Sequence, residues 1–242
     1  MERRRYQVLD TIRGCALVSM ILYHTSWDLV YLFGADWPWY HGFAAHVWQQ
    51  SICWTFILLS GYCFSLGRHQ FRRGMTVFLC GALITAVTWA FMPENRVLFG
   101  VLTLLGSSTL LANGFQHLLQ KIPPRAGLAG SFLLFLLTRD VNAGYLGFEG
   151  ARIFRFPDGA RDLGTAFAGF PPADFFSTDY FSILPWFFLF LTGYFLFRLR
   201  PEETREIRRV PVVTAMGRHS LLIYMLHQPV IYVLLTAVCK AG

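Results

Sequence analysis

Seven long apolar runs constrain this chain more than any other feature of its sequence. A helix needs about 20 apolar residues to cross roughly 30 Å of hydrocarbon. All of the runs except the fifth reach about that length, and we expect the fifth to extend at one or both ends. The pattern predicts an all-α fold: a polytopic membrane helix bundle with about seven transmembrane helices. The runs lie near residues 11–33, 44–66, 75–92, 97–119, 126–138, 180–199 and 218–238.

The composition excludes the soluble classes of protein. Only 14% of the 242 residues are charged, whereas 55% are hydrophobic and 17% are aromatic. Soluble domains carry about 25% charged residues, so this chain is neither a soluble enzyme nor a disordered or collagen-like chain. The connections between the apolar runs are mostly short, and no internal repeat or linker separates them. We therefore expect one transmembrane domain over residues 1–242.

The basic residues predict the orientation of the bundle. Lys and Arg resist translocation and mark cytoplasmic loops. With a cytoplasmic N-terminus, seven crossings place 15 of these residues inside and 6 outside, which together are the 21 present. The segment 139–179 then lies outside, either as a partly ordered lid or as a solvated loop. The cytoplasmic clusters are Arg3, Arg4 and Arg5; Arg68, Arg72 and Arg73; and Arg198, Arg200, Arg205, Arg208 and Arg209.

The first run carries ionisable residues on one helix face. At 100° per residue, the 11 residues from Arg13 to His24 make three turns plus 20°, so both lie on one stripe about 16 Å apart. Asp28 follows one turn after His24 on nearly the same face. Ionisable groups inside a membrane are costly and mark functional sites by default. The alternative is that they only tie helices together through hydrogen bonds.

These residue types indicate a specific chemistry. An imidazole with a carboxylate one turn away can act as a general base on a hydroxyl or an amine. A guanidinium at the inner interface suits phosphate, because its planar fork binds such oxygens bidentately. The stripe of Arg13, His24 and Asp28 therefore predicts a phosphate-bearing donor that enters from the cytoplasm. A proton-coupled small-molecule transporter, with His24 and Asp28 as a relay, is the alternative from another class.

The motifs on this stripe resemble a known enzyme family. Leu9-Asp10-Thr11-Ile12-Arg13-Gly14 and His24-Thr25-Ser26-Trp27-Asp28 are similar to the start of bacterial relatives of heparan-α-glucosaminide N-acetyltransferase. The spacing from Arg13 to His24 also resembles the related acyltransferase-3 integral-membrane superfamily. Softer matches follow in order along the chain: Phe99-Gly100-Val101-Leu102, Asp179-Tyr180-Phe181, Gly217-Arg218-His219-Ser220-Leu221 and Tyr224-Met225-Leu226-His227-Gln228-Pro229.

The resemblance implies an enzyme of the inner, plasma membrane of a bacterium. It implies transfer of an acetyl group from cytoplasmic acetyl-CoA to an amine or hydroxyl of an extracytoplasmic sugar or glycan, with CoA as product. His24 would be the catalytic residue, as general base or as acyl carrier, and Asp28 its catalytic partner. The family analogy also allows a homodimer, and nothing points to nucleic acid.

Further polar residues of the runs are candidates for the donor site. Arg13 would bind the phosphates of the donor, whereas Ser60 and Tyr224, like Asn113, could donate to the thioester oxygen as it gains charge. His227 lies about 13 Å deeper than Arg218, near the level of His24, and could contact the pantetheine arm. Helix packing by Ser60 and a helix–helix hydrogen bond by His227 are the alternatives.

Two residues near the outer surface are candidates for the acceptor site. His46 could meet acceptor hydroxyls, with an interfacial imidazole as the alternative. Asp179 could do the same, with capping of the helix that follows it as the alternative. No set of His, Cys, Asp or Glu has the spacing of metal ligands, so we expect no metal.

Overall fold

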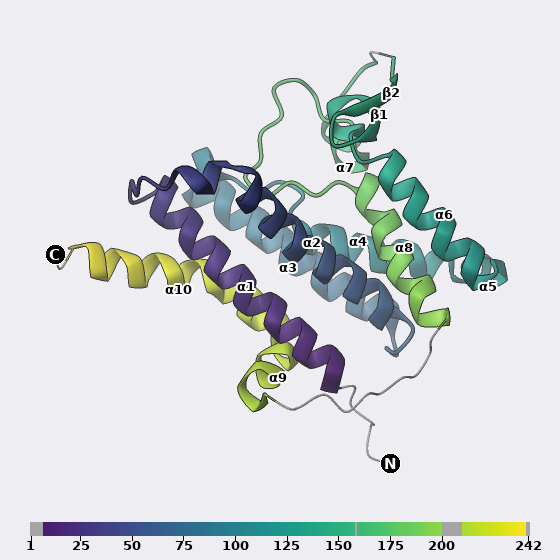
Figure 1. Ribbon diagram of the computed structural model, residues 1–242, viewed down its shortest axis with the longest axis horizontal. Coiled ribbons are helices and arrows are strands. Elements are labelled where there is room, and N and C mark those ends of the chain that lie inside the picture. Colours follow the sequence, from purple (N-terminus) through teal and green to yellow (C-terminus); the bar gives the residue numbers. More distant parts are fainter. Residues whose placement is uncertain (1–6, 158, 200–209, 241–242) are drawn as a thin grey trace. The chain divides into compact units, whose positions relative to one another are not determined.

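The computed structural model describes residues 7–157, 159–199 and 210–240 and is mostly helical (Figure 1). The basic clusters at residues 3–5 and 200–209 lie outside the described residues. The ten α-helices of the described part are α1 (Gln7–Tyr31), α2 (Phe43–Phe64), α3 (Gln70–Phe91), α4 (Val101–Gly114), α5 (Gln116–Lys121), α6 (Pro124–Leu137), α7 (Leu163–Ala168), α8 (Ile183–Leu199), α9 (Pro211–Arg218) and α10 (Ser220–Lys240).

Each of the seven predicted apolar runs contains one main helix, so the prediction of a mostly helical protein is confirmed. By length and composition, α3 and α10 can cross a membrane, and α4, α6 and α8 are shorter apolar helices. The number of transmembrane crossings stays a prediction. The fifth run extends by only two residues, to Pro124, because Pro123 and Pro124 end the helix on that side.

Contacts divide the chain into two compact units, and the boundary falls within α2. The first unit comprises residues 1–56 and 203–242, and the second comprises residues 57–202. The expectation of one domain over residues 1–242 stays a prediction.

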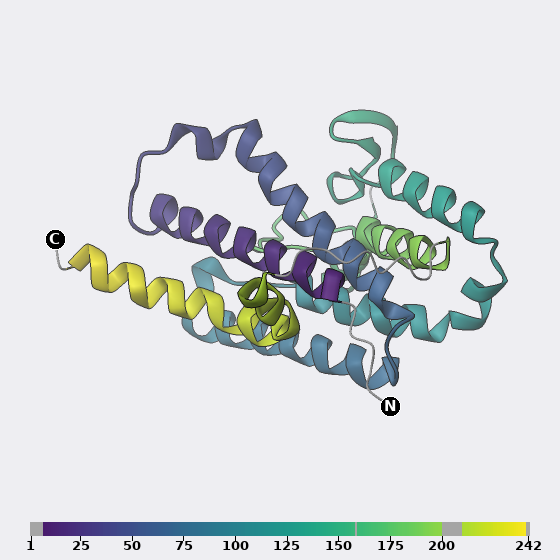
Figure 2. The same cartoon turned by 60° about the horizontal axis from the view of Figure 1, so that its bottom comes forward.

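In the first unit, α1 packs against α9 and α10 from the other end of the chain (Figures 1 and 2). Leu17, Met20 and Ile52 form its buried apolar core. The backbones of α1 and α9 approach closely at two glycines. A Cβ at Gly14 would overlap the carbonyl of Val213, and one at Gly217 would overlap that of Asp10. Small residues permit such close helix contacts in membranes.

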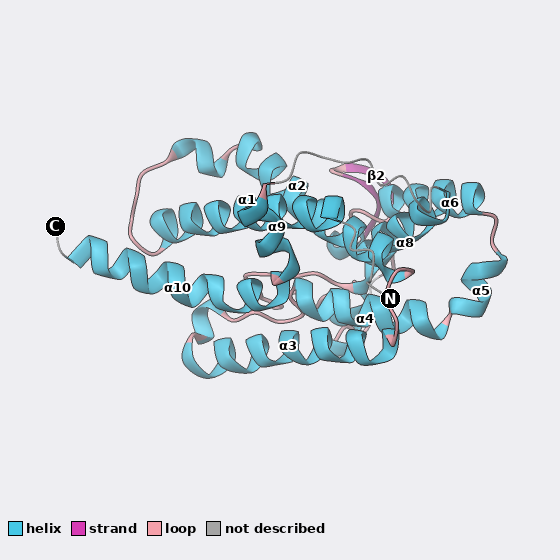
Figure 3. Cartoon of the chain, turned by 90° about the horizontal axis from the view of Figure 1, so that it is seen from below, coloured by secondary structure: helices cyan, strands magenta, loops and turns pink. Residues whose placement is uncertain are grey.

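The second unit also contains close helix contacts at glycines. In it, α3 packs along α4 (Figure 3), and α6 packs along α8. At two crossings, each helix places a glycine against the backbone of the other. The pairs of glycine and contacted residue are Gly81 with Thr103 and Gly106 with Phe78 between α3 and α4, and Gly61 with Phe190 and Gly193 with Leu58 between α2 and α8.

The long apolar helices expose large hydrophobic side chains. On α3 these include Leu79, Leu83 and Trp89, and on α10 they include Leu222, Val233 and Val238. Large apolar side chains that lie exposed on the same helix are unfavourable in water. They fit contact with lipid, in which helices satisfy their own backbone polar groups.

The segment 139–179 adds a small β-hairpin that the prediction of an all-α fold did not include. Strand β1 (Tyr145–Phe148) pairs antiparallel with β2 (Ala151–Arg155). The turn between them has positive φ at Glu149 and Gly150, a conformation that glycine adopts without strain. Arg139 forms an ion pair with Glu149 at 3.2 Å. The segment therefore has local structure, and its role as a lid stays a prediction.

The glycine contact between α1 and α9 leads to a first prediction. Replacing Gly217 with Ala places a methyl group against the carbonyl of Asp10, so α9 must shift away from α1. We expect Gly217→Ala to lower stability by about 1–3 kcal/mol, measured as a lower thermal midpoint in detergent. Gly130→Ala on α6 is the control, because a Cβ there meets nothing within 4 Å and helix propensity favours Ala. Equal midpoints for the two variants would contradict the packing argument.

Candidate functional site

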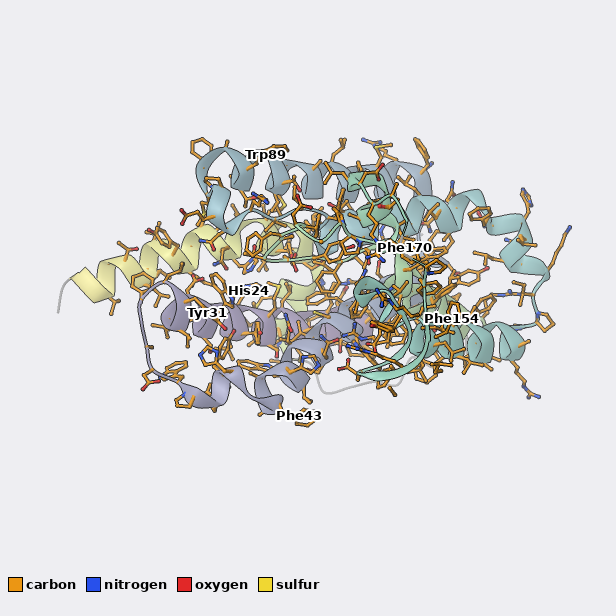
Figure 4. All side chains as sticks on the ribbon, turned by 90° about the horizontal axis from the view of Figure 1, so that it is seen from above. His24, Tyr31, Phe43, Trp89, Phe154 and Phe170 are labelled. Atoms are coloured by element: carbon orange, nitrogen blue, oxygen red, sulfur yellow. The ribbon has the colours of Figure 1, made fainter. Side chains whose placement is uncertain are left out.

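The first unit brings two histidines together from opposite ends of the chain. His24 on α1 lies toward α10 (Figure 4), where its ring meets that of His227 edge-on, with 4.8 Å between centroids. The sequence analysis placed His227 near the level of His24 by assuming one helix from Arg218, whereas the structure has two helices, α9 and α10, that meet at His219. The roles of both residues stay predictions.

A hydrogen bond fixes the tautomer of His227. Its Nδ1 lies 2.6 Å from the backbone carbonyl oxygen of Tyr224. A carbonyl only accepts, so Nδ1 carries the proton and donates it. Nε2 therefore carries a lone pair, and it is buried without a hydrogen-bond partner among the described residues. This nitrogen is a base whose lone pair no described protein group uses.

Asp28, four residues after His24 on α1, is fully buried. The amide Nε2 of Gln228 donates to its Oδ1 at 2.6 Å, whereas Oδ2 has no hydrogen-bond partner among the described residues. The sequence analysis paired Asp28 with His24 as its catalytic partner. No hydrogen bond joins these two side chains in the described part of the chain, where one carboxylate oxygen of Asp28 is bound to α10.

Gln228 is a site residue that the sequence analysis missed. Its amide is the polar group that binds the buried Asp28 carboxylate. The signal that could have found it is an uncharged amide inside an apolar run, directly after His227. Such side chains tie helices together in lipid, where the alternative is an unsatisfied polar group.

The opposite end of the stripe is a small charge cluster. Arg13 Nη1 contacts Asp10 Oδ1 at 3.0 Å, and Arg218 Nε lies 3.8 Å from Asp10 Oδ2. Two guanidinium groups thus contact one carboxylate. Arg13 is part-buried, and Arg218 is exposed. An anion can therefore meet two cations at this end of α1.

Aromatic rings surround the connection from α1 to α2. Trp37 stacks on Trp39, with 6.0 Å between centroids, and Trp39 stacks on Trp48 at 6.3 Å. The hydroxyl of Tyr40 donates to the carbonyl of Tyr23. Burial raises the pKa of Tyr40, so its hydroxyl stays protonated as a donor. His46 lies exposed in the first turn of α2.

The remaining predicted site residues, Ser60 and Asp179, belong to the second unit. Ser60 is part-buried on α2, next to the close contact at Gly61. Asp179 precedes α8, but its Oδ2 accepts a hydrogen bond from the Val101 N–H at 3.2 Å and so caps α4. The expected alternative, capping of the following helix, is therefore replaced by capping of an earlier one. Among the described residues, no group of three or more His, Cys, Asp or Glu could hold a metal ion.

The comparison with known families decides the class of protein. The family model described as heparan-alpha-glucosaminide N-acetyltransferase, catalytic, matches residues 5–229. The chain belongs to this family. No curated protein and no solved structure matches the chain significantly.

Membership in the N-acetyltransferase family confirms the resemblance found in the sequence and the prediction of an enzyme. The chain is an acetyl-CoA-dependent acyltransferase embedded in a membrane, and the family uses acetyl-CoA as its donor. A glucosamine-type acceptor is implied by the family. The motifs Asp10-x-x-Arg13-Gly14 and His24-x-Ser26-Trp27-Asp28 lie within the matched residues.

The capping role of Asp179 leads to a second prediction. Burial raises the pKa of its carboxyl from 3.8 to about 6, partly opposed by the hydrogen bond from Val101. The folded state therefore holds a proton that the unfolded state has lost, and stability falls as pH rises from 3.8 to about 6. Asp179→Asn keeps an oxygen for the cap but cannot ionise. We expect its thermal midpoint, relative to the wild type, to rise with pH across this window.

The control for net charge is Asp174→Asn, which removes a negative charge from an exposed position. If Asp179 instead binds the acceptor, Asp179→Asn will raise the KM for the acceptor and leave the pH dependence of stability unchanged. That result would contradict the structural assignment.

Proposed function

We propose that this enzyme transfers an acetyl group from cytoplasmic acetyl-CoA to the amine of an extracytoplasmic glucosamine-type sugar. The reaction would take place at the cluster of His24, Asp28 and His227 on α1 and α10. One observation carries the proposal: two buried acceptor atoms on α1 and α10, Asp28 Oδ2 and His227 Nε2, have no hydrogen-bond partner among the described residues, and the ring of His227 meets that of His24. A substrate group with several N–H donors would satisfy both.

The proposal includes the predicted arrangement in the membrane. About seven transmembrane helices, with the N-terminus in the cytoplasm, put 15 of the 21 Lys and Arg on the cytoplasmic side. The membrane would be the inner membrane of a bacterium. A homodimer stays a prediction, and the mass of the detergent-solubilised protein measures it.

The donor would bind at the end of α1 that carries the charge cluster. Arg13 and Arg218 both contact the carboxylate of Asp10, so two guanidinium groups lie at this end of α1. Phosphate oxygens accept bidentate hydrogen bonds from guanidinium groups. The nucleotide end of CoA would therefore lie near Arg13, and its thioester would extend about 16 Å along the stripe toward His24. Tyr224, which precedes His227 on α10, stays a candidate donor to the thioester oxygen.

The chemical step is acyl transfer. The acceptor nitrogen attacks the carbonyl carbon of the thioester, a C–N bond forms and the C–S bond breaks. His24 takes the proton that the attacking nitrogen must lose and returns it to the CoA thiolate, as a general base that becomes a general acid. If His24 instead carries the acetyl group, its own nitrogen makes the first attack. We favour direct transfer, because it asks for only one attack geometry.

The aromatic rings after α1 support a sugar as acceptor. Trp37, Trp39 and Trp48 form a stack of near-parallel rings, and Trp39 is 48% exposed. Flat, rigid aromatic faces offer a large apolar contact area, which suits the C–H face of a pyranose ring. His46, in the first turn of α2, would meet hydroxyls of the same sugar. These residues follow the end of α1 that carries Asp28.

The proposal predicts acetyl transfer that depends on His24. The purified enzyme with labelled acetyl-CoA and a panel of amino sugars should form an N-acetylated product. We expect His24→Ala to lower kcat by at least about 100-fold, the scale of general acid–base catalysis, while CoA still stabilises the variant against heat. His117→Ala, at an exposed histidine of α5, is the matched control.

Retained transfer in His24→Ala would refute the catalytic role of His24. Proton-coupled uptake of a small molecule into liposomes, without any acetylated product, would support the transporter instead.

The proposed function also predicts which residue binds the donor. Arg13→Ala should raise the Kd for CoA by about tenfold or more, because a hydrogen bond to a charged group contributes about 1.5–3 kcal/mol. Arg13→Lys should give an intermediate Kd, since it keeps the charge but loses the planar fork. Arg125→Ala, at an exposed arginine of α6, is the control. Calorimetric titration measures each Kd, and an unchanged value for Arg13→Ala would place the phosphates elsewhere.

A further inference from the structure

We propose that His227 is a second proton acceptor of the site, which takes the first proton from the acceptor's ammonium group and leaves the second to His24. This inference rests on the proposed function, because it assumes that the acceptor is an amine. It replaces contact with the pantetheine arm, which the sequence suggested for His227, with a direct part in the chemistry.

The need for two acceptors follows from the proton balance. An amino sugar near neutral pH is largely an ammonium ion, R–NH3+, whose nitrogen has no lone pair for attack. One proton must leave before the C–N bond forms, and a second must leave the nitrogen of the tetrahedral adduct. The CoA thiolate takes up the second proton, so the whole reaction is R–NH3+ plus acetyl-CoA giving R–NH–acetyl, CoA and one H+. A hydroxyl acceptor would need only one base.

The geometry of His227 suits the first of these steps. Its Nδ1–H is engaged with the Tyr224 carbonyl at 2.6 Å, so its basic nitrogen is Nε2. Nε2 is buried and has no hydrogen-bond partner among the described residues. When it takes a proton, the bond from Nδ1 to the carbonyl becomes charge-assisted and stronger. The imidazolium is therefore stabilised by a group already in place.

Other titratable and charged residues lie on the elements packed around His227. The titratable groups near it are Tyr224 on its own helix and His24 and Asp28 on α1. Arg218 is the last residue of α9, and His219 separates it from α10, which carries His227. Asp28 accepts a hydrogen bond from Gln228, the residue next to His227. Because the two rings are 4.8 Å apart, the two imidazoles would carry charge in turn rather than together.

The test uses glucosamine as acceptor and follows acetyl transfer as a function of pH. We expect His227→Gln to lose about 100-fold in kcat/KM below the pKa of the acceptor amine. The loss should shrink to a few fold above that pKa, because the free amine needs no first base. His24→Ala should stay inactive throughout, since the adduct must lose its second proton at every pH. His117→Gln, at an exposed position of α5, is the matched control.

A second variant guards against misfolding. His227→Phe keeps a ring against His24 but has no basic nitrogen, and stabilisation by CoA reports whether each variant folds. The same recovery at high pH in either folded variant supports the inference. An equal loss at all pH values, or no loss at any, overturns it. If the wild-type enzyme acetylates no amine at all, the proposed function fails instead, and the two failures are thereby distinguished.

Discussion

The contact of α1 with the C-terminal helices is the constraint on which the rest of the site depends. An ionisable group inside an apolar bundle cannot be solvated by lipid, so another helix must supply its partner. Gly14 and Gly217 let the backbones of α1 and α9 approach closely, and α10 follows α9 directly in the chain. Gln228 and His227 thereby reach Asp28 and His24. Without that approach, a buried carboxylate would have no compensating donor.

The residues of the first stripe could be predicted from the sequence because helical periodicity fixes which side chains share a face. Arg13, His24 and Asp28 need only a continuous helix, and α1 runs unbroken from Gln7 to Tyr31. The positions of the main helices followed in the same way from the lengths of the apolar runs. The boundary of α6 at Pro124 lies two residues before the start of the fifth predicted run.

What the sequence did not reveal depends on pairing between distant segments. Asp28 and Gln228 are 200 positions apart, and periodicity gives the face of each helix but not its partner. The same reason explains Asp179, which caps α4 rather than the helix that follows it. The hairpin of β1 and β2 lies in a segment whose short strands carry no regular alternation, so composition alone could not identify it.

The number of bases in the site follows from its location in an apolar bundle. In an enzyme open to solvent, water can remove an excess proton from an ammonium substrate. Here the protein must hold that proton itself, because the apolar helices of the site leave few other acceptors. A single imidazole would suffice for a hydroxyl acceptor, whereas an amine needs two bases in succession. In the proposed function, the pairing of His24 with His227 connects the contact between α1 and α10 to the transfer of acetyl groups to nitrogen.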